Sequence, residues 1–172
     1  MAVYALGDLI PDIDPSAYIS PEAVVIGRVR IGPESTVWPH AVVRGDDGAI
    51  TIGARTSIQD NAVVHCTDEW DTGIGDDCTI GHLAHLEGCR IANGALVGSG
   101  AIVLHDAHVG EMALVGAGAL VPGGLHVPPR AIAVGVPAKV RPDAVRDELI
   151  LPGVRKYVRR GHWYRADLRR LD

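Results

Sequence analysis

Aliphatic side chains recur every six residues along most of this chain, and this repeat constrains the fold more than any other feature. The repeating positions are Ile13, Ile19, Val25, Ile31, Val37, Val43, Ile52, Ile58, Val64, Ile74, Ile80, Leu86, Ile91, Val97, Val103, Val109, Val115 and Val121. Neither the 3.6-residue period of a helix nor the alternation of a simple strand explains a six-residue period over about 110 positions. A β-helix does, since each unit supplies one short strand and a corner, and three units close a coil.

The composition suits such a coil. The 172 residues are enough for one domain, and they include no Phe but 21 glycines, more than the roughly 7% that is usual. In a coil the repeating aliphatic residue points inward and its two neighbours point outward. A small residue four positions later fills each corner: Ala41, Thr56, Ala62, Cys78, Ala95, Ala101, Ala113 and Ala119. This hexapeptide pattern resembles the left-handed parallel β-helix family over residues 11–138.

The end of the chain loses the repeat. We therefore predict an all-β left-handed parallel β-helix over residues 1–140 and a C-terminal α-helical segment over 141–172 that packs along it. Pro142 and Asp143 suit a helix start, and Leu-Pro-Gly at 151–153 interrupts it, so two helical pieces are expected. Residues 139–172 hold 10 Lys/Arg against 5 Asp/Glu, whereas residues 1–138 hold 6 against 16. This basic face is expected to be solvated and to complement the acidic coil.

Leader and membrane signals are not found. The first residues lack the basic and apolar regions of a signal peptide, and no stretch approaches the ~18 apolar residues of a membrane span. Cys66, Cys78 and Cys89 are odd in number and lack C-x-x-C spacing, which predicts reduced thiols. We expect a cytoplasmic protein that binds neither nucleic acid nor membrane.

Two breaks in the period mark candidate functional loops. Val43 and Ile52 are nine residues apart, and Val64 and Ile74 are ten apart. Repeat proteins usually project such insertions toward one functional face. Both insertions are polar, with Arg-Gly-Asp-Asp in the first and Thr-Asp-Glu-Trp-Asp in the second.

Stacking the coils in register predicts which polar side chains meet. Arg44, His65 and Glu87 form one outward column, on strands about 4.8 Å apart. His85 and Glu87 flank the inward Leu86 on the same face.

A second group lies on the neighbouring face. Asp60 is expected one coil below His82, with Gln59 beside them. Because His82 belongs to a different face from His85 and Glu87, one chain would have difficulty closing all three around one ion. Two chains packed face to face would not.

Four segments resemble the gamma-class carbonic anhydrase family: RGD at 44–46, IQDNAVVH at 58–65, TIGHLAHLEGC at 79–89 and GVPAKV at 135–140. The resemblance implies a homotrimer with zinc, or another divalent metal, at each subunit interface. It implies reversible hydration of the small molecule CO2 by a metal-bound hydroxide, which makes the protein a lyase (carbonate dehydratase). At the matched positions it implies an ion pair of Arg44 with Asp46 near the site, and Gln59 and Asp60 as residues that orient the metal-bound solvent.

The metal ligands follow from the same resemblance. His65 matches the first ligand, and His82 matches the ligand that a neighbouring chain supplies. The third ligand departs from the pattern, because Glu87 stands where the family has histidine. Three alternatives stay open: Glu87 binds the ion, as in His₂Glu zinc sites, His85 binds it instead, or no metal binds. An anionic ligand would raise the pKa of the bound water and weaken hydration near neutral pH.

Two rival functions remain. An acyl-CoA thioesterase or acyltransferase can use the same fold, because a fold does not decide an activity. The other rival is a metal-free trimeric scaffold protein. The remaining histidines, His105 among them, have no matching partner in this scheme and are expected at the surface or at an interface.

Overall fold

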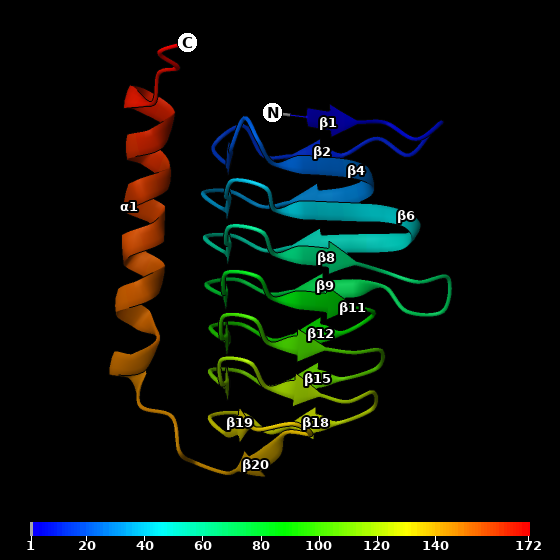
Figure 1. The fold of residues 1–172 in the computed structure, drawn as a ribbon, viewed down its shortest axis with the longest axis vertical. Helices are drawn as coiled ribbons and strands as arrows, with labels where there is room; N and C mark the ends of the chain where they lie inside the picture. The colour runs from blue at the N-terminus through cyan, green and yellow to red at the C-terminus, as the bar shows by residue number, and fades with distance from the viewer. Residues whose placement is uncertain (1) are drawn as a thin grey trace.

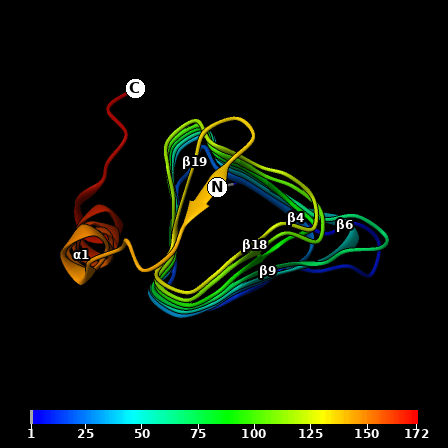
Figure 2. The ribbon, with the colours of Figure 1, turned by 90° about the horizontal axis from the view of Figure 1, so that it is seen from below.

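The computed structural model describes residues 2–172 and shows a column of stacked coils with one helix along its side (Figure 1). Seen along the column, the coils superpose as a triangle, with the helix α1 outside one edge and β6 protruding at the opposite corner (Figure 2). The expected fold class, a parallel β-helix of hexapeptide repeats with a C-terminal helical segment, is confirmed.

Two of the three faces belong to one sheet. Face A contains β1 (Ala2–Tyr4), β8 (Val63–His65), β11 (His85–Glu87), β14 (Ile102–Val103) and β17 (Leu120–Val121). Face B contains β2 (Asp12–Ile13), β9 (Thr72–Ile74), β12 (Arg90–Ile91), β15 (His108–Val109) and β18 (His126–Val127). The long strands β4 (Val24–Ile31) and β6 (Val42–Ile52) run through the corner between these faces and join them into a 12-stranded sheet.

Face C is an 8-stranded sheet. Its strands are β3 (Tyr18–Ile19), β5 (Thr36–Val37), β7 (Ser57–Ile58), β10 (Thr79–Ile80), β13 (Leu96–Val97), β16 (Leu114–Val115), β19 (Ile132–Val134) and β20 (Lys139–Arg141). Each strand pairs in parallel with the strand one coil away, except that β20 turns back antiparallel to β19. The expected boundary at residue 140 therefore falls inside the last strand.

The six-residue repeat forms the core. Val64 and Leu86 on face A are fully buried, as are Ile58 and Ile80 on face C. The small residues predicted for the corners are buried as well. A close-packed aliphatic interior of this kind fixes the register, since a slip of one residue would turn each inward side chain outward.

The corners depend on a second position that the repeat did not indicate. Three residues after an inward aliphatic residue, the backbone takes a positive φ, as at Leu83 (62°), Gly100 (67°) and Asp106 (56°). This left-handed conformation costs a non-glycine residue roughly 1–2 kcal/mol. It recurs because it lets a short corner turn the chain from one face to the next.

The prediction of two helical pieces is wrong. Residues 139–141 are strand β20, a 3₁₀ turn η1 covers Asp147–Leu149, and one α-helix, α1, spans Leu151–Asp167. Leu-Pro-Gly begins this helix, because proline has no N–H to lose in the first turn. No helix among residues 2–172 has the length and apolar character needed to cross a membrane.

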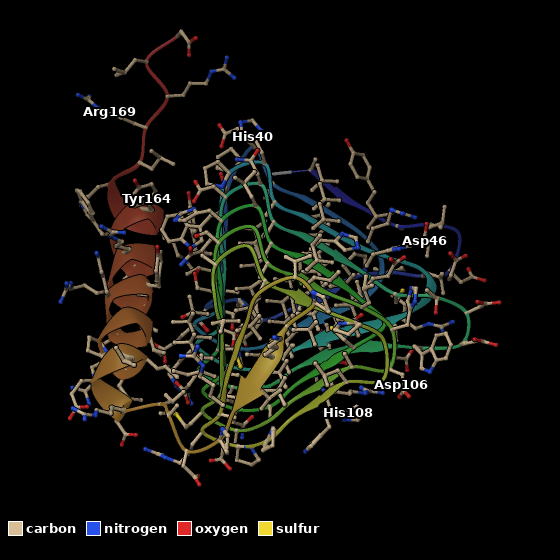
Figure 3. The ribbon with its side chains drawn as sticks, turned by 60° about the horizontal axis from the view of Figure 1, so that its bottom comes forward. His40, Asp46, Asp106, His108, Tyr164 and Arg169 are labelled. Carbon is tan, nitrogen blue, oxygen red and sulfur yellow. The ribbon has the colours of Figure 1, made fainter. Side chains whose placement is uncertain are left out.

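Aromatic side chains attach α1 to face C. The Trp38 ring meets Tyr157 and Tyr164 edge-on, with centroids 5.7 and 5.0 Å away. Figure 3 shows Tyr164 turned from α1 toward the coil, while Asp46 lies across the molecule. The helix approaches closely at Gly161, where a Cβ would lie 2.6 Å from Thr36 Cγ2.

Candidate metal centre

The predicted column on face A is present. Parallel pairing places Arg44 beside His65 and His65 beside Glu87 on successive strands. These side chains stand at the corner between faces A and B, here called the A–B corner. His65 is the least exposed of them, with 13% of its side chain accessible. The predicted juxtaposition of His65 and Glu87 is therefore confirmed.

Asp46 holds one side of the His65 ring. It follows Arg44 in β6 where that strand bends through the corner, and it pairs with the Arg44 guanidinium. Its Oδ1 lies 2.9 Å from His65 Nε2. Partial burial by itself would raise the pKa of Asp46, but hydrogen bonds from His65, its own backbone and Arg44 outweigh burial and lower it. Asp46 is therefore ionised at neutral pH.

Glu87 lies among three histidines. Its Oε1 is 3.1 Å from His65 Nδ1, and its Oε2 is 3.3 Å from His85 Nε2 and 3.5 Å from His105 Nε2. The hydrogen bond from His65 lowers the pKa of Glu87, partial burial opposes this, and His85 and His105 add to the lowering. Each oxygen of the Glu87 carboxylate therefore has at least one imidazole nitrogen beside it.

His105 is a site residue that the sequence reasoning missed. It stands two positions after the inward Val103, one coil beyond Glu87, and the Trp70 ring stacks on it at 5.6 Å and 21°. The expectation that His105 has no matching partner is wrong. The spacing from Val103 matches that of His82 from Ile80, which indicates a corner position for His105 but not its contact with Glu87.

The second predicted group is also present, at the corner between faces C and A, here called the C–A corner. Asp60 Oδ2 lies 2.8 Å from His82 Nδ1. The buried Gln59 accepts a hydrogen bond from the His82 backbone N–H at 3.2 Å. Nearly half of the His82 side chain is exposed, so its second ring nitrogen is open to a ligand from outside the chain.

Within one chain the expected ligands do not converge. Among residues 2–172, the group of three whose donor atoms all lie within 4.8 Å of one another is Asp46, Asp47 and His65. His82 is not in that group, and neither is His85 or Glu87. The structure therefore separates the expected ligands into an A–B set and a C–A set, as the assignment to faces predicted.

The donor chemistry fits a divalent ion. Imidazole nitrogen and carboxylate oxygen are both accepted zinc ligands, and His65 Nδ1 and Glu87 Oε1, which hydrogen-bond at 3.1 Å, lie close enough to bind one ion together. A histidine that binds metal almost always donates its other ring N–H to a carboxylate or carbonyl. Asp46 and Asp60 are placed to accept such bonds from His65 and His82.

The cysteines near these residues are structural. Burial raises the pKa of Cys89 to about 12, and burial likewise raises the pKa of Cys66, although hydrogen bonds from Gly48 and Asp47 oppose it. Thiolate is the form that binds metal. Neither side chain is therefore a candidate ligand.

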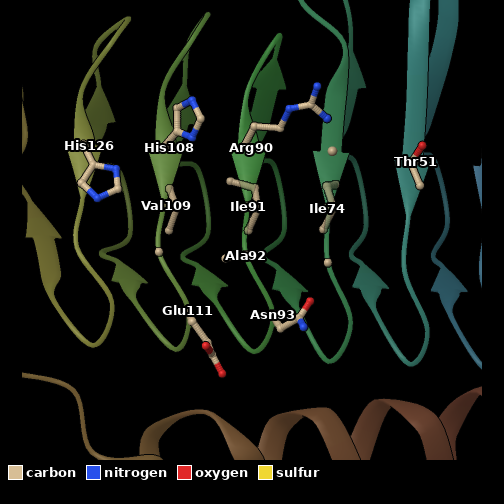
Figure 4. Close-up of a pocket in the computed structure, with 13 residues that line it drawn as sticks. Thr51, Ile74, Arg90, Ile91, Ala92, Asn93, His108, Val109, Glu111 and His126 are labelled. Carbon is tan, nitrogen blue, oxygen red and sulfur yellow. The ribbon is translucent and has the colours of Figure 1, made fainter.

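A surface groove lies elsewhere, on face B. It is a groove of about 600 Å³, along which Arg90, His108 and His126 stand on successive strands (Figure 4). Arg90 lies across Gly73, whose Cβ would be 2.6 Å from Arg90 Nη1. None of the expected site residues lines this groove, so it does not mark the candidate centre.

Comparison with known proteins gives close relatives with different names. No protein-family model matches the chain. It is 40% identical over 166 residues to the carbonic anhydrase of Geobacillus kaustophilus, an alignment that covers 95% of this chain and 91% of that protein. It is 37% identical over 149 residues to the carnitine operon protein CaiE of Escherichia coli, with 87% and 76% covered.

Solved structures agree on the fold. A Bacillus cereus protein provisionally assigned as an acetyltransferase superposes with a TM-score of 0.94 at 35% identity, over 96% of this chain and 97% of that one. The names of these relatives differ in activity while their fold is shared, so the choice of activity depends on the site.

Proposed function

The chain belongs to the hexapeptide-repeat β-helix family of the gamma-class carbonic anhydrases and the CaiE proteins, and from this premise we propose that it is a metal-dependent carbonic anhydrase. It converts CO2 and water reversibly into bicarbonate and a proton. The ion is held by His65 and Glu87 of one subunit and His82 of the next subunit in a homotrimer.

The main support is the pair of imidazoles backed by carboxylates. If His65 donates Nε2–H to Asp46, its Nδ1 keeps the lone pair on the side of Glu87. If His82 donates Nδ1–H to Asp60, its Nε2 keeps the lone pair. Each corner thus places a carboxylate behind an imidazole, which is the arrangement common to protein metal sites. At His65 a metal would take the place of the hydrogen bond between Nδ1 and Glu87.

The shape of the molecule supports a site shared between subunits. The C–A and A–B corners are the two edges of face A. If three copies turn face A toward a common axis, the C–A corner of one copy meets the A–B corner of the next. His82 then lies against the His65 and Glu87 of its neighbour, which completes a set of three ligands.

Face A has the surface that such packing requires. Its strands pair in register through one column of outward residues: Val24, Val42, Val63, His85, Ile102 and Leu120. All but His85 are aliphatic, and Val63 and Ile102 are exposed in the single chain. An apolar surface of this kind is a common mark of a protein–protein interface.

The roles of the chain's own groups follow. Bound there, a divalent ion would supply the Lewis acidity that makes water nucleophilic near neutral pH. Asp46 and Asp60 hold the ring tautomers, and Arg44 holds Asp46. Glu87 contributes a negative charge that lowers the charge of the ion felt by water, so we expect slower hydration near neutral pH than with a third imidazole.

Subunit complementation tests the proposal. His65→Ala and His82→Ala should each remove zinc binding and CO2 hydration, since each deletes one ligand from every site. Co-expression of the two variants should restore intact sites at about a quarter of the interfaces of randomly mixed trimers, because a cyclic interface uses different surfaces of its two subunits. Zinc content and stopped-flow CO2 hydration are the measurements.

Two results would overturn the proposal. Mixed trimers that bind no zinc would show that the site is not shared between subunits. Hydrolysis or transfer of acyl groups from acyl-CoA by a protein that does not hydrate CO2 would favour the other activity found on this fold.

A further inference from the structure

The insertion between β8 and β9 folds a tryptophan back onto the coil. The Thr67 backbone N–H donates to Trp70 O at 3.0 Å, and the Trp70 N–H donates to Thr67 Oγ1 at 3.1 Å. These two bonds close a tight turn. The indole then stacks on the His105 ring at 5.6 Å and 21°.

Gly88 makes room for this stack. Its φ is +61°, and a Cβ there would lie 2.9 Å from Trp70 Cβ and 3.3 Å from His105 Cδ2. Its backbone is fixed on both sides, because Gly88 N–H donates to Thr72 Oγ1 at 2.8 Å and Gly88 O accepts the Asp106 N–H at 2.8 Å. The residue after Glu87 is thus tied both to the start of β9, directly after the insertion, and to the corner that contains His105.

The stacked His105 ring reaches the outer oxygen of Glu87. His105 Nε2 is 3.5 Å from Oε2, while His65 Nδ1 is 3.1 Å from Oε1. The two imidazoles therefore lie at different oxygens of one carboxylate. His85 Nε2 hydrogen-bonds the same Oε2 at 3.3 Å, so the two rings hold this oxygen together. Of the two, His105 is the ring that stacks on Trp70.

From this geometry we propose that His105, held by Trp70, is a positioning residue for Glu87, so that the carboxylate offers only Oε1 to a metal ion beside His65. The inference rests on the proposed function and extends it to a residue and a loop outside the ligand set. A metal-binding carboxylate is normally hydrogen-bonded by a neighbour, and loss of such a neighbour typically weakens metal affinity 10–100-fold. The insertion that lengthens the spacing from Val64 to Ile74 to ten residues contains Trp70, the residue that holds the His105 ring.

Zinc affinity of the purified trimer tests this directly. Competition with a chromophoric chelator should give a dissociation constant 10–100-fold higher for His105→Ala than for the natural protein. His105→Gln keeps an N–H near the position of Nε2 and should recover most of the affinity. His108→Ala is the matched control, since His108 contacts Asp106 and not Glu87, and it should bind zinc like the natural protein.

A double-mutant cycle separates positioning from a general structural effect. In a Glu87→Gln background, His105→Ala should cause no further loss of zinc affinity, because His105 acts through the carboxylate. The visible spectrum of the Co²⁺-substituted protein should change with His105→Ala and stay unchanged with His108→Ala.

The outcomes are distinguishable. If the natural protein binds zinc and His105→Ala binds it equally well, the positioning role is wrong and the proposed function stands. The role is also wrong if His105→Ala weakens binding as much with Gln at position 87 as with Glu. If the natural trimer binds no zinc, the proposed function fails and this inference fails with it.

Discussion

At the scale of single side chains, His65 and His82 differ in the number of carboxylates that face the ring. Glu87 and Asp46 face the two ring nitrogens of His65, whereas Asp60 alone faces a ring nitrogen of His82. Asp46 lies 2.9 Å from Nε2 of His65, and Asp60 lies 2.8 Å from Nδ1 of His82. An ionised carboxylate only accepts hydrogen bonds, so the nitrogen it faces holds the proton. At His82 the acidic partner thereby leaves Nε2 available to a metal. At His65 a metal would have to replace the hydrogen bond between Nδ1 and Glu87.

Asp60→Asn tests the effect of Asp60 on His82. The asparagine amide can donate to His82 Nδ1, which favours the tautomer protonated at Nε2 and removes the outward lone pair. We expect zinc affinity to fall 10–100-fold, with the far-UV circular dichroism of the coil unchanged.

The matched control is Asp77→Asn. The Asp77 side chain is 36% exposed, against 38% for Asp60, and it pairs with Arg55. It lies between β9 and β10, at the corner between faces B and C, whereas His82 lies at the C–A corner. This change should leave zinc affinity unaltered. Equal affinities for Asp60→Asn and the natural protein would show that the tautomer of His82 is set in another way.

At the scale of elements, α1 stands next to the C–A corner because it covers face C. Trp38 is central to this contact. Its indole N–H donates to Thr36 Oγ1 and Ser57 Oγ at 2.9 and 3.0 Å, while its ring meets the two tyrosines of α1. Ser57 begins the strand β7 that leads into Gln59 and Asp60. The helix thus packs on the strand that positions the residues around His82.

Gly161→Val tests how closely α1 must approach. A side chain there would clash with Thr36 Cγ2, so the helix must shift outward at a cost of about 1–3 kcal/mol. We expect a lower urea midpoint and faster tryptic cleavage at Arg155 and Lys156. Gly153→Val is the control, because a Cβ at Gly153 has no neighbour within 4 Å. Equal cleavage rates for the two variants would contradict this account of the helix contact.

At the scale of the whole molecule, the apolar column of face A decides whether the two half-sites meet. Ile102 lies in this column, directly beside His85 on the neighbouring strand. Its side chain is exposed in the single chain and would be buried in the proposed trimer.

Ile102→Glu should therefore dissociate the trimer, because each interface would bury an unpaired carboxylate at a cost of several kcal/mol. Light scattering after size exclusion should show folded monomers, and zinc affinity should fall because no neighbour supplies His82. Thr51→Glu, on the exposed side of face B, should remain trimeric and bind zinc. A trimeric Ile102→Glu protein would exclude face A as the interface.

Much of this arrangement could be predicted from the sequence, since a β-helix turns sequence spacing directly into position. The six-residue repeat predicts which residues point inward, and stacking the coils predicts the pairs His65 with Glu87 and Asp60 with His82. The conformation of the corners and of the C-terminal segment could be predicted less well from the sequence. Leu-Pro-Gly is compatible with either ending or starting a helix, and packing against Trp38 favours one continuous helix.

The sequence by itself determined the coil, its register and the separation of the site residues onto two corners, because each of these follows from a local repeat. Only the tertiary structure decided that His105 faces Glu87. That contact depends on the direction of a corner side chain, which Trp70 sets from an insertion about 35 positions earlier, and no local pattern encodes it. The same limit applies to α1, whose docking depends on side chains more than 100 residues away in the chain.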